Sequence, residues 1–119
     1  MLGQHFGRLI HVPGTLAANL DIRFSVPVDC RLVRVSHCAG NDSDATFTLG
    51  VSGDTDSILT STNLGDSGTP TVEDVDDWAA TNPTGRLSQG DVLVITLDFD
   101  GVAGAAAQDV TMDLDFIEG

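Results

Sequence analysis

Aspartates are the residues of this chain that could do chemistry, because they recur in close pairs along it. The pairs and groups are Asp42/Asp44, Asp54/Asp56, Asp74/Asp76/Asp77 and Asp98/Asp100. Calcium takes roughly six to eight oxygen ligands, often from alternating aspartates on a loop. The segment 98–101 comes nearest to such a loop, but it lacks a third acid before its glycine and a distal glutamate. In a chain with sixteen aspartates chance pairs are expected, so we predict solvated loop carboxylates, with no metal and no other cofactor.

Histidine and cysteine do not form a recognisable catalytic or zinc pattern either. His5, His11 and His37 lack partners at the spacing that zinc sites require. His37 precedes Cys38, but adjacent residues on a strand point to opposite faces and would not meet. The chain has no G-x-S-x-G, no P-loop and no G-x-G-x-x-G that opens a helix. We therefore predict a protein that is not an enzyme.

The charge of the chain excludes two classes of partner. Eighteen acidic residues face five arginines and no lysine, which gives a net charge of -13. Such a charge repels nucleic acid phosphates and anionic lipid, so we predict no nucleic acid partner and no membrane partner. A dense acidic surface stays soluble where salt screens its self-repulsion, as in a halophilic host or its virus. An ordinary acidic protein from a GC-rich genome is the other interpretation.

The charge is also unevenly distributed along the chain. Residues 1–40 sum to +2, whereas residues 41–119 sum to -15. One interpretation is a mildly basic face that docks on an acidic partner. The other is that the arginines pair with aspartates on neighbouring strands.

The elements that position these side chains are strands, most clearly in the C-terminal third. Apolar residues occupy every second position through Leu93–Phe99 and Val110–Phe116. Strict alternation is typical of a strand with one buried face. We expect these two strands to form the interior of the fold and to close it as a hairpin.

The rest of the chain predicts further short strands separated by turn residues. The expected strands are 8–12, 18–26, 30–38, 46–51 and 57–62, with a strand start and one helical turn within 71–80. Turn signals recur roughly every 8–12 residues, which is typical of an antiparallel β-sandwich. The sequence thus predicts an all-β, jelly-roll-like sandwich of about eight short strands over residues 8–119, preceded by an N-terminal arm, residues 1–7.

Two further features bear on the environment of the protein. Cys30 and Cys38 would lie about 26 Å apart on one strand at roughly 3.3 Å per residue. A disulfide needs Cα atoms within about 7 Å, so we predict two free thiols. No apolar run approaches the roughly 20 residues of a membrane span or resembles a signal peptide, so we expect neither a span nor export.

Two residues could serve either the fold or a partner. Trp78 is the single tryptophan of a chain without tyrosine. It could stack on a sugar, or it could plug the core or an interface. Val102 lies in the loop 100–108, which is rich in alanine and glycine. This loop could form a subunit contact, or it could pack over the end of its own sandwich.

The chain resembles small jelly-roll decoration or cement proteins of the capsids of tailed viruses. The resemblance rests on residues 85–119: the strand Gly90–Ile95, the alanine/glycine loop and a last strand that runs almost to Gly119. It implies a non-enzymatic virion protein, made in the host cytoplasm, that binds the outer capsid surface as a homotrimer. Its partner would be the major capsid protein or another virion protein.

This resemblance leads to two hypotheses about partner contacts. Under the first, the apolar arm and an arginine contact the capsid shell, and two further residues contact partners. The predicted partner-contact residues are Leu2, Phe6, Arg8, Leu9, Trp78 and Val102. Under the alternative, the chain is a carbohydrate-binding or adhesion module of a viral fibre or turret, with Trp78 on the sugar.

Overall fold

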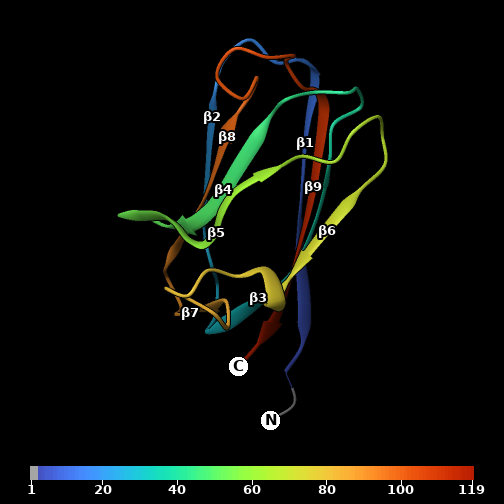
Figure 1. The fold of residues 1–119 in the computed structure, drawn as a ribbon. Helices are drawn as coiled ribbons and strands as arrows, with labels where there is room; N and C mark the ends of the chain where they lie inside the picture. Colours follow the sequence, from blue (N-terminus) through green and yellow to red (C-terminus); the bar gives the residue numbers. More distant parts are fainter. Residues whose placement is uncertain (1–2) are drawn as a thin grey trace.

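The computed structural model describes residues 3–119 and consists of two packed antiparallel sheets (Figure 1). Its elements are β1 (His5–Thr15), β2 (Leu20–Ser25), β3 (Cys30–Cys38), β4 (Thr46–Val51), β5 (Asp54–Asn63), β6 (Thr71–Asp74), the 3-10 turn η1 (Val75–Asp77), β7 (Arg86–Leu87), β8 (Val92–Asp98) and β9 (Gln108–Glu118). One sheet has the order β1-β9-β3-β6, with β7 also paired to β3, and the other has the order β2-β8-β4-β5. This is the strand order of a jelly roll, so the predicted all-β sandwich is confirmed.

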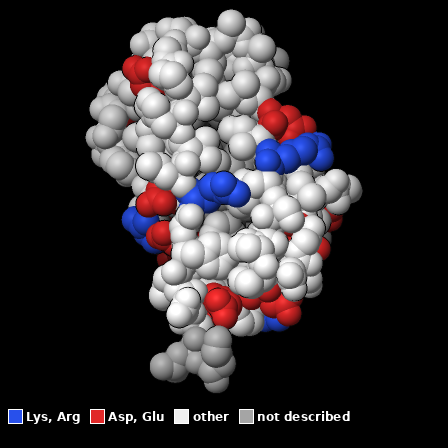
Figure 2. Space-filling view, turned by 180° about the vertical axis from the view of Figure 1, so that it is seen from behind, with Lys and Arg blue, Asp and Glu red and all other residues white. Residues whose placement is uncertain are grey.

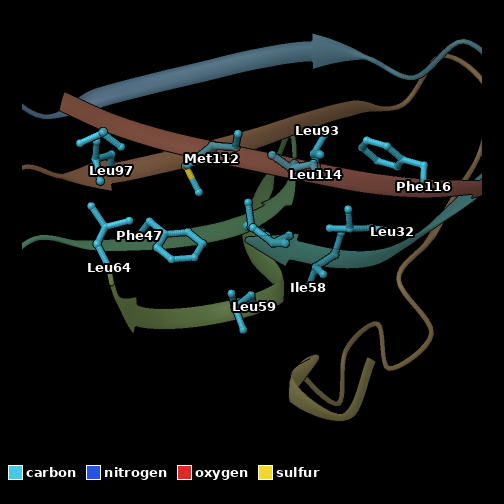
Figure 3. Close-up of a cluster of buried hydrophobic side chains, with 14 of the residues drawn as sticks. Leu32, Phe47, Ile58, Leu59, Leu64, Leu93, Leu97, Met112, Leu114 and Phe116 are labelled. Carbon is cyan, nitrogen blue, oxygen red and sulfur yellow. The ribbon is translucent and has the colours of Figure 1, made fainter. Parts of the chain in front are cut away.

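The core lies between the sheets and comes from alternate residues of nearly every strand. Of the C-terminal residues expected to point inward, Phe99 is only partly buried, and the others are at most 1% exposed: Leu93, Ile95, Leu97, Val110, Met112, Leu114 and Phe116. Figure 3 shows side chains from β8 and β9 meeting those of β3, β4 and β5. The period-2 alternation therefore predicted the buried face correctly.

The strands β8 and β9 do not form the expected hairpin. β8 pairs with β2 and β4, whereas β9 pairs with β1 and β3 in the other sheet. The segment between them crosses from one sheet to the other, a span of about 10 Å in packed sheets. Alternation identifies the inward face of a strand, but it does not identify the neighbour.

The segment predicted as an N-terminal arm enters the sheet earlier than expected. β1 begins at His5, and its pairing with β9 places Phe6 opposite Phe116. The two rings stack with centroids 4.9 Å apart, a contact between the two ends of the chain that no local pattern indicates. Residues 5–7 are therefore strand, and Leu2 lies outside the described residues.

The far end of β1 also extends beyond its predicted stop at Pro13. The register with β9 shifts between Val12 and Thr15, and Gly14 adopts a φ of +81° there. Such an irregularity accommodates the proline, which has no N–H for the ladder, and the strand then continues.

The segment 71–80 contains the predicted strand start and helical turn. The turn lies at Val75–Asp77 and is capped by Asp74. Asp74 accepts a hydrogen bond from the Asp76 N–H, and the Asp77 carboxylate accepts one from the Asp74 N–H. These reciprocal bonds form a capping box, which ends β6 after four residues.

The strands β3 and β4 have the predicted bounds, and both cysteines are free thiols. Burial raises the pKa of the Cys30 thiol above its ordinary value. Within residues 3–119, no helix has the length and apolar character needed to span a bilayer.

Candidate functional site

The predicted partner-contact residues divide into exposed and buried positions. Leu9 is 70% exposed on the outer face of β1, and Val102 is 84% exposed on the loop between β8 and β9. Phe6 is half-buried and Arg8 is exposed, both beside the core. Trp78, in contrast, is only 7% exposed.

Trp78 is a core residue and is not available to an external partner or a sugar. Its indole N–H donates a hydrogen bond of 2.9 Å to the Leu32 carbonyl of β3. It thereby closes the sandwich where the segment after β6 passes over β3. The interpretation as a plug agrees with this placement, and Trp78 leaves the set of candidate contact residues.

A small aromatic pocket opens between the edge strands β1 and β2. It has a volume of about 200 Å³ and is lined by Phe6, Gly7, Arg8, Phe24, Pro27 and Phe116. The Phe24 ring meets the Phe116 ring edge-on at 6.2 Å. The Arg8 guanidinium lies over Phe24, 4.4 Å from its centroid, a cation–π contact. Such a pocket can accept an apolar side chain that has a carboxylate beside it.

The loop that carries Val102 is held in place by its own sandwich. The Asp44 carboxylate accepts a hydrogen bond of 2.7 Å from the Ala105 N–H, and the Asn41 side chain donates one of 2.9 Å to the Ala106 carbonyl. The Asp98 and Asp100 carboxylates accept hydrogen bonds from the Val102 N–H, at 3.3 and 3.0 Å. These aspartates organise the loop.

Val102 itself has an unusual backbone conformation. Its φ is +94°, a region that β-branched residues rarely adopt. Such strain persists only where surrounding contacts determine the conformation, and it occurs preferentially at functional positions. The loop thus presents one bare apolar side chain at the end of the molecule.

The exposed large apolar side chains fall on a few elements. In the described residues they are Leu9, Val72, Val75 and Val102. Leu9 lies on β1, at one edge of the sheet β1-β9-β3-β6, whereas Val72 and Val75 lie on or just after β6, at the other edge. The exposure of Val72 and Val75 could not be predicted from the sequence, because no local pattern shows that β6 is an edge strand.

The arginines do not gather on one basic face. Arg23 pairs with Asp21 of the same strand at 3.0 Å, and Arg34 pairs with Asp115 of the neighbouring β9 at 3.3 Å. Figure 2 shows basic side chains separated from one another, with acidic side chains near them. Cross-strand pairing thus applies to Arg34. Arg8, in contrast, forms no ion pair with any described residue.

His37 forms a polar contact inside the sandwich, where β3, β6 and the β5–β6 loop meet. Burial lowers its pKa to about 4, so the imidazole is neutral at pH 7. Its Nδ1 accepts a hydrogen bond of 3.2 Å from the Gly65 N–H, and its Nε2 faces Glu73 at 3.3 Å. Burial also raises the pKa of Glu73. This contact attaches β6 to the core.

Metal ligation finds no support in the geometry of the described residues. Across residues 3–119, no group of three or more His, Cys, Asp or Glu side chains is placed to hold an ion. What the surface offers is apolar side chains on edges and a loop, together with one aromatic pocket. This arrangement suits binding to another protein surface.

Comparison with known proteins gives a fold and no family. No protein-family model matches the chain, and no curated protein matches it. Among solved structures it is similar to a chain described as the capsid asymmetric unit of cyanophage Pam1, with a TM-score of 0.59 and 15% identity. The match covers 99% of this chain and 87% of that chain, so the two are of comparable length.

Proposed function

We propose that this protein is a virion structural protein that decorates the outer surface of a viral capsid as a homotrimer. Its partner there is the major capsid protein or another virion protein. The observation that carries the proposal is the shared fold, over nearly the full length of both chains, with a chain of a phage capsid assembly. The jelly roll itself serves many functions, so the proposal also needs a surface that fits it.

The exposed features of the molecule support a role in surface association. The packed sandwich presents single apolar side chains on rigid elements. The most exposed of these side chains is that of Val102. A few fully buried residues at the centre of an interface contribute most of its binding energy, whereas solvated rim charges contribute little. A net charge of -13 keeps the remaining surface in water.

We assign the contact with the shell to the loop that carries Val102. Its strained φ and its bonds to Asp98 and Asp100 hold the side chain away from the body of the sandwich. A preorganised loop loses little conformational entropy on binding. The loop lies at the end of the sandwich opposite to the C-terminus (Figure 1), so the C-terminus would face outward.

Substitution of Val102 tests this assignment. Val102→Asp should weaken the affinity for capsids that lack the protein roughly tenfold, because loss of a central apolar contact costs about 1–2 kcal/mol. Ser52→Asp is the matched control, since it adds the same charge at an exposed position on the β4–β5 turn. Cosedimentation with capsids measures both.

A second variant separates binding from folding. Val102→Gly removes the side chain and relieves the positive φ, so its thermal stability should equal or exceed that of the wild type. If Val102→Gly and Val102→Asp both bind capsids like the wild type, the loop is not the contact. If the wild-type protein shows no affinity for capsids, the proposed function fails.

A further inference from the structure

We infer that copies of this chain associate head to tail, with β1 of one copy adding to β6 of the next, so that the sheet β1-β9-β3-β6 continues from copy to copy. The inference deepens the proposed homotrimer, because it assigns the surfaces through which the copies meet. It does not depend on which surface contacts the capsid.

β1 is a long free edge whose residues 5–12 have little protection against pairing, because its proline and its register shift lie beyond Val12. At 11 residues it is the longest of the edge strands, and its register with β9 is unbroken from His5 to Val12. Proteins normally protect such edges with lysine, proline, bulges or short length. The edges of the other sheet have such protection: β2 contains an Arg23–Asp21 pair, and β5 has two register shifts.

The free backbone groups of the two edges can be identified from the ladder. The Glu118 N–H donates to the Gln4 carbonyl at 2.8 Å, which sets the phase of the β1–β9 ladder. In an antiparallel ladder alternate residues bond to one neighbour, so every second residue points its N–H and C=O outward. On β1 these outward-facing residues include Gly7 and Leu9. Following the same alternation through β9 and β3 shows that the N–H and C=O of Val72 on β6 also point outward.

The side chains of the two edges complement each other in charge. β1 (His5–Thr15) holds Arg8 and two histidines but no acid, whereas Thr71–Asp77 holds four acids and no base. Both edges also carry bare apolar side chains, Leu9 on one and Val72 and Val75 on the other. Three of the four exposed large apolar residues thus lie on the two edges that would meet.

One register satisfies these features together. Placing Leu9 opposite Val72 of the next copy pairs two residues whose backbone groups both face outward, with both side chains on the outer face. Antiparallel pairing then brings Arg8 opposite Glu73, whose carboxylate lies on the inner face beside His37. It also carries Val75 toward Phe6 and Gly7, which line the aromatic pocket. An apolar side chain flanked by carboxylates is the occupant that this pocket fits.

The direction of the strands allows the arrangement to close. Neighbours in the order β1-β9-β3-β6 are antiparallel, so β6 runs opposite to β1. A copy of β1 that pairs antiparallel with β6 therefore points the same way as the first β1. Copies related in this way can follow a rotation about an axis along the strands, which is the condition for a closed ring.

Crosslinking through new cysteines tests the pairing. In a Cys38→Ser background, the double variant Leu9→Cys with Val72→Cys should form disulfides between chains under mild oxidation, and reduction should reverse them. Within one chain the two positions are three strand spacings apart, about 14 Å, too far for a bond. Each single variant should stay uncrosslinked, because head-to-tail contact brings Leu9 only to Val72. A crosslink in the Leu9→Cys single variant, or none in the double variant, would overturn the inference.

The native mass in solution gives an independent measurement. Leu9→Asp or Val72→Asp, each at an exposed position, should convert the oligomer to monomers while the circular dichroism spectrum stays unchanged. Val102→Asp is the matched control and should keep the wild-type mass, since it lies on neither edge. A wild-type monomer that still occupies capsids would overturn the inference and the proposed homotrimer, and would leave only the decoration of capsids standing. An oligomer without affinity for capsids would overturn the proposed decoration of capsids and leave the head-to-tail pairing standing.

Discussion

β9 and β6 flank the same strand, β3, yet they are held there by different forces. β9 lies between two strands and buries every second side chain, with Val110, Met112, Leu114 and Phe116 at most 1% exposed. β6 has one neighbour, exposes 45% of Val72 and is attached through the His37–Glu73 contact. The centre of the sheet is thus held by apolar packing, and its edge by polar bonds that respond to pH.

The largest effect should come from the centre. Leu114→Ala removes a fully buried side chain of β9 and leaves a cavity between the sheets. We expect it to lower the free energy of unfolding by about 2–5 kcal/mol, as measured by urea denaturation. Leu9→Ala is the matched control on the neighbouring strand. Its side chain is 70% exposed, so the free energy of unfolding of the monomer should change by less than about 0.5 kcal/mol.

A smaller effect should appear at the edge when the pH falls. The pKa of His37 is about 4 in the folded protein, against an ordinary value of 6.5. At a pH between these two pKa values, His37 is protonated in the unfolded chain and neutral in the folded protein. The contribution of His37 to the free energy of unfolding is therefore fully present above pH 6.5. It is lost as the pH falls to 4, and this loss is about 3 kcal/mol at most. Urea unfolding across this range, compared with His37→Gln, isolates the contribution.

Glu73 opposes this loss and sharpens the test. Its raised pKa means that the folded protein takes up a proton at a higher pH than the unfolded chain, which stabilises the fold on acidification. Glu73→Gln removes this opposing titration and keeps an acceptor for the imidazole. The variant should therefore lose more stability than the wild type at low pH. Parallel pH profiles for the wild type and His37→Gln would show that the edge does not depend on His37.

The smallest effect should come from a single hydrogen bond beside the edge. Trp78→Phe keeps an aromatic ring but removes the N–H that donates to the Leu32 carbonyl. A buried carbonyl left without its donor costs about 1–2 kcal/mol. Hydrogen exchange should quicken in residues 75–87 and stay slow in β9. Equal protection in the two segments would contradict the distinction between centre and edge.

The interior of the fold could be predicted from the sequence because it depends on local alternation. The bounds of β3 and β4 and the inward residues of β8 and β9 follow from period-2 patterns alone. The placement of β8 and β9 in different sheets could not be predicted in this way, because the alternation within a strand does not show which sheet the strand joins. Phe6 looked unpaired for the same reason, since its partner Phe116 lies at the other end of the chain.

The candidate contact surfaces were predicted only in part. Leu9 was indicated by the apolar arm and Val102 by the alanine/glycine loop, and both side chains are exposed. Val72 and Val75 fit a buried pattern equally well, and only the strand order shows that β6 is an edge. Trp78 was ambiguous because burial of an indole depends on a distant carbonyl, that of Leu32.

The position of β9 in the sheet has a consequence for how the protein is made. β1 emerges from the ribosome before the other strands of the sandwich, yet its pairing partner within the sheet is β9. Its apolar inner face therefore stays without its partner strand until nearly the whole domain has been translated. Such late closure predicts slow folding, as expected where most contacts join distant parts of a chain. During synthesis, chaperones that hold extended apolar segments would have β1 as a target until β9 has been made.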